Sequence, residues 1–220
     1  AVIQGFDPKI GWEDLAEAAY TLANPDILWI ATNTDQSIPK ERGQAPGNGT
    51  LVAAVASATR RTPLVAGKPE APIFHTAAKA VNSSRPVIVG DRLDTDILGA
   101  NNAKMDGALV LTGVQTYQDV IEAVPNQRPT YILRTLEDFF APYPEIEVLY
   151  EGYEVTATGP TWQARVRGEN LSLTGPEIED TEAFAGSESE AEAWRVACAA
   201  WWAANPEQGA RPNIQGIPGA

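Results

Sequence analysis

Two aspartates stand where a strand-like run gives way to a helix, and their carboxylates could bind a metal ion. The apolar run from Val87 to Gly90 predicts a strand, and Asp91 follows it directly. Ligands of open α/β sheets lie at the carboxyl ends of the strands, so this carboxylate is well placed. Asp96 comes one turn of loop later, so both carboxylates could face the same crevice and hold a hard divalent cation such as Mg²⁺. A second interpretation stays open, in which Asp96 caps the helix and Asp91 lies in an exposed turn.

A lysine occupies a similar place on the preceding strand. The run Gly67-Lys68-Pro69 follows the strand-like segment 62–66 and leads into a predicted helix. A lysine there is a point charge that can neutralise phosphate oxygens, and a helix N-terminus favours the same anion. The alternative for Lys68 is a solvated surface residue.

A polar loop follows the apolar run 27–31. Asn33 and Asp35 belong to this loop, which continues into a stretch rich in Pro and Gly at 39–49. Polar residues at the end of a buried strand suit substrate selection, and an ordinary turn with Asx capping explains them equally well.

The elements that position these residues alternate between strand and helix, which predicts an α/β fold with a parallel sheet and helices on both faces. We expect strands at 1–6, 27–31, 62–66, 86–90, 108–111 and 130–133, and helices at 12–22, 48–58, 69–81, 96–103, 116–124 and 136–140. The Pro- and Gly-rich stretch 39–49 is expected to be loop, with Asn48 or Thr50 capping the helix that follows.

The pattern changes after residue 143, where a small α+β domain is expected. Strands are predicted at 146–150, 153–157 and 162–166, followed by a long helix over 188–205 and a disordered tail. Four tryptophans of this region are expected in a core or interface rather than in a ligand site; they are Trp162, Trp194, Trp201 and Trp202.

Composition excludes several classes of function. The net charge of −13 argues against nucleic acid and anionic membranes as partners, because such binding needs clusters of Lys and Arg. Most of that charge is local, since residues 143–193 hold twelve acids against two arginines. No apolar run reaches the length of a membrane span, and a signal-peptide pattern is absent at the start, so a cytoplasmic protein is expected. A single histidine, His75, is expected at the surface or in helix packing and excludes histidine-based metal sites. A single cysteine, Cys198, is expected to be buried and excludes an internal disulfide.

The order of these motifs resembles HAD-superfamily phosphatases of the NagD-like class IIA. The series is Gly-Phe-Asp, Ala-Thr-Asn-x-Asp, Pro-Gly-Asn-Gly, Gly-Lys-Pro and Gly-Asp-Arg-Leu-Asp-Thr-Asp-Ile, and it runs from residue 1 to about 140. The resemblance implies a HAD-like Rossmannoid sheet, with residues 1–67 as the C-terminal part of a cap domain and residues 68–142 as the C-terminal half of the core. Residues 143–220 would form an accessory domain with an acidic surface.

The resemblance also implies roles for the candidate residues. Lys68 would contact the nucleophile and the phosphate as a catalytic residue. Asp91 would bind Mg²⁺ directly, and Asp96 would be a ligand or a support for it. Asn33 and Asp35 would face the substrate from the cap.

One part of the family pattern is missing from this sequence. The Asp-x-Asp-Gly motif, which supplies the nucleophile of an aspartyl-phosphate mechanism, occurs nowhere in it. We therefore expect a fragment that is inactive alone and needs the N-terminal half of the same protein, or a second chain, to cover the sheet edge at Val87–Val89.

The substrate expectation is a small phosphometabolite. The region after 143 resembles the additional domain of actinobacterial family members, some of which act on glycerol 3-phosphate; phosphoglycolate and a nucleotide monophosphate come next. The alternative is a shortened, non-catalytic homologue that binds a phosphometabolite.

Overall fold

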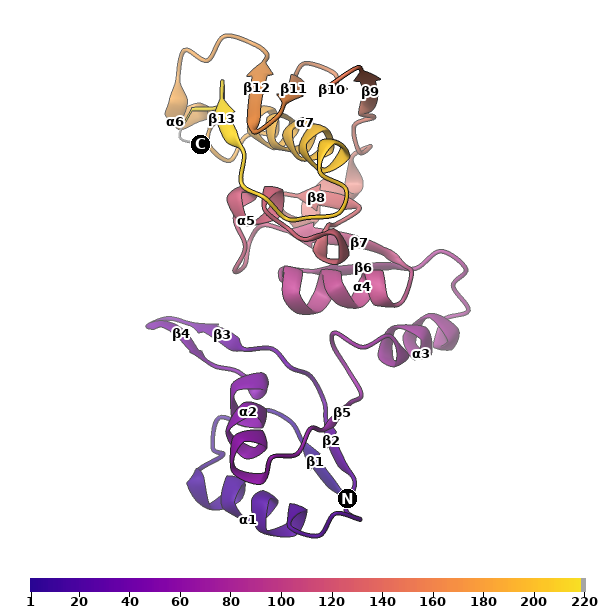
Figure 1. Ribbon diagram of the computed structural model, residues 1–220. Coiled ribbons are helices and arrows are strands. Elements are labelled where there is room, and N and C mark those ends of the chain that lie inside the picture. The colour runs from indigo at the N-terminus through magenta and orange to yellow at the C-terminus, as the bar shows by residue number, and fades with distance from the viewer. Residues whose placement is uncertain (219–220) are drawn as a thin grey trace. The chain divides into compact units, whose positions relative to one another are not determined.

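The structure is a computed structural model that describes residues 1–218, and the chain divides into two compact units. Unit 1 comprises residues 1–88 and 94–106, and unit 2 comprises residues 89–93 and the chain from 107 onward (Figure 1). Both units contain parallel strands and helices, which confirms the α/β prediction. No helix among residues 1–218 is long and apolar enough to cross a membrane.

The sheet of unit 1 is parallel throughout. In spatial order its strands are β1 (Val2–Gln4), β2 (Trp29–Ala31) and β5 (Leu64–Val65). Parallel neighbours need a crossover connection, and the two helices α1 (Trp12–Leu22) and α2 (Asn48–Thr59) lie in these connections. The predicted helix at 12–22 is confirmed to the residue.

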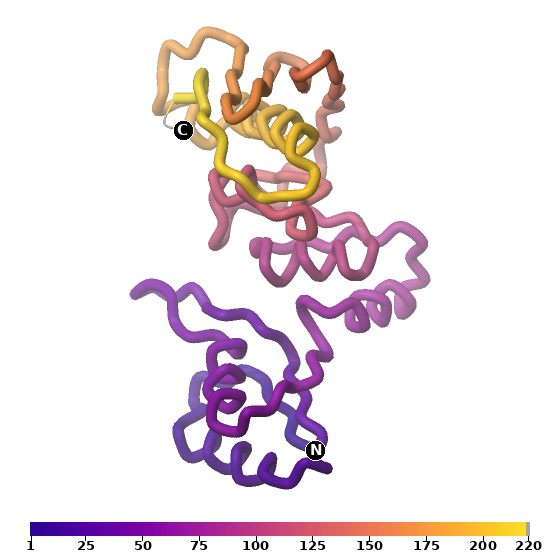
Figure 2. The backbone as a smooth tube through the Cα atoms, viewed as in Figure 1, coloured from indigo at the N-terminus to yellow at the C-terminus, as the bar shows by residue number. Residues whose placement is uncertain are grey.

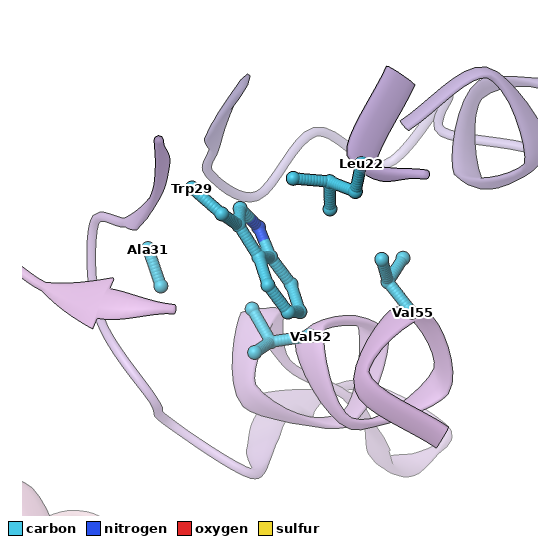
Figure 3. Packing of buried hydrophobic residues seen from close by; sticks show 5 residues of the cluster. All are labelled: Leu22, Trp29, Ala31, Val52 and Val55. Atoms are coloured by element: carbon cyan, nitrogen blue, oxygen red, sulfur yellow. The ribbon is translucent and has the colours of Figure 1, made fainter. Parts of the chain in front are cut away.

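The core of unit 1 forms where α1 and α2 meet the middle strand. Figure 3 shows the indole of Trp29 between Leu22 of α1 and Val52 and Val55 of α2, with Ala31 beside it. Burial of side chains of this size stabilises a fold by roughly 1.5–3 kcal/mol each. The indole nitrogen of Trp29 also finds a partner, because it donates to Oε1 of Gln4 at 3.2 Å.

The stretch expected to be loop at 39–49 is a two-stranded ribbon instead. Strands β3 (Ser37–Lys40) and β4 (Gly43–Pro46) pair antiparallel, and Figure 2 shows them side by side. Proline is tolerated here because a ribbon of two strands has a solvent-facing edge on each strand. The capping prediction was also wrong, because Gly47 is the N-cap of α2 and Asn48 is already inside the helix.

Two further helices complete unit 1. Helix α3 (Pro72–Ala80) follows Lys68, and α4 (Leu98–Asn102) follows a π-helical turn, η1 (Leu93–Ile97). The amide of Asn102 donates to the carbonyl oxygen of Pro69 at 2.9 Å, which ties α4 to the segment before α3. Gly99 has no room for a Cβ because the ring of Phe74 lies against it.

A second three-stranded sheet lies mostly in unit 2. Its order is β6 (Val87–Gly90), β7 (Asp106–Val110) and β8 (Tyr131–Leu133), and β7 and β8 are parallel. The connection between them contains α5 (Tyr117–Ile121), which Thr116 caps through a capping box with Asp119, and the short helix η2 (Pro125–Gln127). Strand β6 is an edge of this sheet among the described strands, and the side chains of Val87 and Val89 are 39% and 43% exposed.

The rest of unit 2 is a five-stranded sheet with a long helix on one face. The helix is α7 (Glu188–Ala204), preceded by η3 (Leu136–Phe140) and α6 (Thr181–Phe184). The strand order is β13 (Asn213–Gln215), β12 (Asn170–Thr174), β11 (Gln163–Arg167), β10 (Glu154–Thr158) and β9 (Glu147–Glu151). All pairs are antiparallel except β12 with β13.

The expected disordered tail was wrong for part of its length. Residues 213–215 form β13, and Ile217 is buried; residues 219 and 220 lie outside the described part of the chain. The tryptophan prediction was confirmed for Trp162, Trp194 and Trp201, which are buried. Cys198 is buried with a free thiol.

Unit 2 is continuous across residue 143. Nε of Arg195 in α7 donates to the carbonyl oxygen of Ile132 in β8 at 2.9 Å, and Nε1 of Trp202 donates to the carbonyl oxygen of Ile121 at 3.2 Å. The division into cap, core half and accessory domain stays a prediction.

Candidate functional site

Lys68 lies between two carboxylates of unit 1. Its Nζ is 3.0 Å from Oδ1 of Asp96 and 3.4 Å from Oδ2 of Asp35. The three residues come from separate segments: the loop after β2, the turn after β5 and the π-helical turn η1. The sequence had singled out each of them, and the fold brings them together.

The ammonium of Lys68 has room for a further partner. The Lys68 side chain is 33% exposed. An ammonium has three donors, and the described residues provide Nζ with two ion-pair partners. In the Lys68 cluster, formed by Lys68, Asp35 and Asp96, the ammonium can therefore donate to one further oxygen atom of a ligand.

Opposing effects set the pKa of Lys68. Burial would lower the pKa, but the hydrogen bond and charge of Asp96, followed by those of Asp35, outweigh it, and the pKa is raised above its ordinary value. The ammonium is consequently charged throughout the neutral range.

Asp96 reaches Lys68 because of the π-helical turn that carries it. It lies inside η1 and is buried, while the N-cap of the following helix α4 is Ile97. The interpretation of Asp96 as a helix cap is therefore wrong. Single π-helical turns are rare overall, but those that occur are often found at functional sites.

The loop that carries Asp35 is fixed by its neighbours. The backbone N–H of Asp35 donates to Oδ1 of Asn33 at 3.2 Å, and the backbone N–H of Thr34 donates to the carbonyl oxygen of Lys68 at 3.1 Å. Gly67 approaches this loop so closely that a Cβ would overlap the carbonyl oxygen of Thr32. This contact explains why a glycine precedes Lys68.

One buried residue at this loop was missed by the functional interpretation of the sequence. Nδ2 of Asn48 donates to the carbonyl oxygen of Asn33 at 2.8 Å, and its side chain is 1% exposed. The Pro-Gly-Asn-Gly run contained the signal, but we expected Asn48 to be a helix cap.

Asp91 belongs to unit 2, directly after β6. Its carboxylate lies against Gly113, where any Cβ would overlap it. Among residues 1–218 no group of three or more His, Cys, Asp or Glu side chains is gathered as a metal site. A carboxylate at the end of a strand still fits Mg²⁺, which often takes one or two protein carboxylates and completes its shell with water and phosphate oxygens.

A second cluster of charges lies in unit 2 and is built differently. Arg195 is ion-paired with Glu188 and lies 3.8 Å from Asp138, and Arg134 bonds to Asp138 at 2.7 Å. The guanidinium of Arg195 also lies 5.0 Å from the ring centre of Tyr143. The Arg195 side chain itself is 2% exposed, while Arg134 and Glu188 of this Arg195 cluster are 32% and 54% exposed and help to line a small pocket.

Several known proteins similar to this chain are named phosphatases. Residues 65–139 match a family model described as HAD-hydrolase-like. A D-glycerol 3-phosphate phosphatase of Mycobacterium tuberculosis is 42% identical over 186 residues, covering 83% of this chain and 49% of that protein. A glycerol-3-phosphate phosphatase of Gallus gallus is 44% identical over 124 residues, covering 54% of this chain and 40% of that protein.

A solved structure is similar over nearly the whole chain. It is a glycerol phosphate phosphatase from Mycobacterium tuberculosis in complex with magnesium, with a TM-score of 0.74 and 34% identity. The similarity covers 98% of this chain and 59% of that one. The chain spans about half the length of the curated relatives it matches.

Proposed function

We propose that this chain, a relative of the HAD-superfamily phosphatases, supplies the lysine and the metal-binding carboxylates of a magnesium-dependent phosphomonoester hydrolase. The observation that carries the proposal is the Lys68 cluster, in which a charged and partly exposed ammonium is held between Asp35 and Asp96. Phosphoryl transfer is catalysed chiefly by positioned charges, and this is the kind of group it needs.

In this proposal Lys68 binds a phosphoryl oxygen through its remaining donor. Asp35 and Asp96 hold the ammonium in place, and their raising effect on its pKa keeps it charged. Asn33 and Asp35 also face the substrate, which makes their loop part of the substrate-binding surface.

Mg²⁺ would be held by Asp91, with Asp96 as a second ligand or as a support through Lys68. When bound, it would neutralise phosphate charge and polarise the phosphoryl oxygens.

The nucleophilic aspartate would come from outside this sequence. It would form an aspartyl-phosphate, which water would then hydrolyse. We propose that the preceding half of the same protein, or a second chain, supplies it and covers strand β6. The partly exposed side chains of Val87 and Val89 support this, because an apolar sheet edge is a surface for strand pairing.

The proposed substrate is glycerol 3-phosphate or a similar small phosphometabolite such as phosphoglycolate. The support comes from relatives named for glycerol 3-phosphate, one of which aligns with 83% of this chain. The proposed organisation is a cap part at 1–67, a core half at 68–142 and an accessory domain at 143–220, in a cytoplasmic protein whose one cysteine is a free thiol.

A second candidate is a non-catalytic protein that binds a phosphometabolite. The partly exposed ammonium of Lys68 favours it, because a positioned cation can bind a phosphate ester without a nucleophile. In that case Lys68 and the carboxylates would bind a phosphate ester without cleaving it.

The deciding experiment uses the longest natural form of the protein that contains this chain. Phosphate release from glycerol 3-phosphate is measured with Mg²⁺ and with EDTA, and binding of the same ester is measured by calorimetry. Mg²⁺-dependent release that Lys68→Ala abolishes supports the enzyme, and Lys79→Ala is the matched control on an exposed lysine. Binding without release would establish the second candidate. If the protein neither binds the ester nor releases phosphate, both candidates are refuted.

A further inference from the structure

The first residues of helix α2 hold the loop that carries Asp35. The backbone N–H of Gly47 donates to the carbonyl oxygen of Gln36 at 2.9 Å, and the N–H of Gly49 donates to the carbonyl oxygen of Asp35 at 2.9 Å. Oγ1 of Thr50 donates to the carbonyl oxygen of Gln36 at 2.6 Å. A Cβ on Gly47 would overlap the carbonyl oxygen of Asp35, so the helix and the loop are in direct contact.

Asn48 extends this contact from inside the helix. Its Nδ2 donates to the carbonyl oxygen of Asn33 at 2.8 Å and lies 3.4 Å from the carbonyl oxygen of Gln4 in β1. The side chain is almost completely buried, and burial of a polar amide is costly unless its hydrogen bonds are made. Oδ1 of Asn48 has no hydrogen-bond partner among the described residues, so the donor side of the amide accounts for its bonds.

The opposite side of the same loop is bound to Lys68 itself. The backbone N–H of Thr34 donates to the carbonyl oxygen of Lys68 at 3.1 Å, and the Asp35 carboxylate lies 3.4 Å from Nζ. A shift of this loop would therefore move both the main chain of Lys68 and one of its two carboxylate partners.

We propose that Asn48 is a positioning residue for Lys68, acting through the loop of Asn33 and Asp35. Asn48 is buried and its bonds go to main-chain oxygens, so it acts on the loop and not on a ligand. The catalytic consequence rests on the role of Lys68 in the proposed function. The effect of Asn48 on the position of the loop and of Lys68 does not rest on that role, and it can be measured without turnover.

An alanine at position 48 cannot replace the amide. The carbonyl oxygen of Asn33 would lose its bond from Nδ2, and a small cavity would open between helix and loop. The carbonyl oxygen of Gln4 keeps a second donor, because the N–H of Thr32 bonds to it at 2.9 Å. The change should therefore loosen the loop more than it loosens β1.

The test compares the amine reactivity of Lys68 in variants of the chain. The sequence has five lysines, and the other four are exposed and act as internal references; they are Lys9, Lys40, Lys79 and Lys104. The protein is labelled briefly with an amine-acylating reagent, and the extent of labelling at each lysine is read by peptide mass spectrometry. An ammonium released from an ion pair is acylated faster.

We expect Asn48→Ala to raise the relative labelling of Lys68 by about twofold to fivefold, the factor that corresponds to loss of a modest ion pair. Asp35→Asn removes the pair directly and should give the same change. Thr59→Ala is the matched control, because it deletes a hydrogen bond at the far end of α2 and should leave Lys68 labelling unchanged.

Thr50→Val provides a second route if Asn48→Ala does not fold by circular dichroism. It removes the bond to Gln36 at an exposed position and should raise Lys68 labelling in the same direction by a smaller factor. Unchanged labelling in a folded Asn48→Ala, or in Thr50→Val where Asn48→Ala fails to fold, would overturn the proposal, as would an equal rise in Thr59→Ala.

Failure of the proposed function has a different signature. Inorganic phosphate with Mg²⁺ should protect Lys68 from labelling if Lys68 binds phosphate. Absence of that protection would count against the proposed function, while the contrast between Asn48→Ala and Thr59→Ala would still decide the positioning role.

Discussion

Lys68 in unit 1 and Arg195 in unit 2 are both paired with carboxylates, and their surroundings differ. Lys68 is 33% exposed and pairs with two carboxylates at 3.0 and 3.4 Å. Arg195 is 2% exposed. Besides its carboxylate partners, it contacts the carbonyl oxygen of Ile132 through a hydrogen bond and the ring face of Tyr143.

The difference separates a group that can act on a ligand from one that holds the fold. The guanidinium of Arg195 is almost fully covered, with its Nε bonded to the carbonyl oxygen of Ile132 and its Nη1 paired with Glu188. The bond from Arg195 to Ile132 also occupies the outer side of β8, so an α7 side chain stands where another strand could pair. An ion pair is therefore evidence for a site only when the cation itself is exposed enough to reach a ligand.

The largest expected effect is that of Arg195→Met on stability. Arg195→Met removes the buried bond to the carbonyl oxygen of Ile132, and the free energy of unfolding should fall by about 1–3 kcal/mol. Urea denaturation followed by tryptophan fluorescence measures this. Arg165→Met is the control, because Arg165 is 49% exposed beside Glu154 and its loss should change stability by less than about 0.5 kcal/mol. Equal losses in both variants would remove the distinction between the two kinds of ion pair.

Lys68→Ala should show the opposite pattern, with a large loss of activity and little loss of stability. Loss of one positioned donor to a reacting oxygen lowers kcat by about 10²–10³-fold. The free energy of unfolding should change by less than about 1 kcal/mol, because an exposed pair contributes little to it. Phosphatase assays on the longest form of the protein and urea denaturation of the same sample give both numbers. A variant that loses stability and keeps its rate would place Lys68 with Arg195 as a structural cation.

Motif order and apolar periodicity predicted much of unit 1. The strand-like runs before Asp35, Lys68 and Asp91 correctly placed these residues at strand ends, because continuous apolar runs mark parallel strands covered on both faces. Whether these side chains meet depends on how the loops pack in three dimensions. The π-helical turn that brings Asp96 to Lys68 is only five residues long, which is too short to show a periodic pattern in the sequence.

The features that the sequence failed to predict depend on distant partners. Strand β13 is three residues in a Pro- and Gly-rich tail, and it exists because β12 pairs with it. The sequence alone suggests that Asn48 is a helix cap, because its hydrogen bond to the carbonyl oxygen of Asn33 cannot be seen in it. Arg195 lies in an Ala- and Trp-rich helix with nothing to show that it bonds to Ile132, 63 residues away.

A smaller effect is expected in acid at the Arg195 cluster. Burial would raise the pKa of Asp138, but hydrogen bonds from Arg134 outweigh burial and the pKa is lowered. A lowered pKa contributes stability that is present above the unfolded value of about 3.9 and lost as pH falls through the folded value. Asp138→Asn should therefore cost about 1–2 kcal/mol near neutral pH and nothing in strong acid, as seen in urea titrations across pH. A cost that stays constant down to strong acid would show that the charge of Asp138 contributes nothing.

The smallest effect belongs to Asp35, and it should appear in alkali. Burial lowers the pKa of Lys68, but Asp96 and then Asp35 raise it above the ordinary value. A raised lysine pKa contributes stability that is present below the unfolded value of about 10.4 and lost as pH rises through the folded value. Asp35→Asn should thus lower the free energy of unfolding by less than about 1 kcal/mol at pH 8, with the difference from the unaltered chain vanishing above the folded pKa. Asp26→Asn, at an exposed acid of the same unit, should show no such alkaline step. Lys68 is partly exposed and Arg195 is buried, so a step larger than that of Asp138→Asn would reverse the order of the two clusters and contradict the comparison.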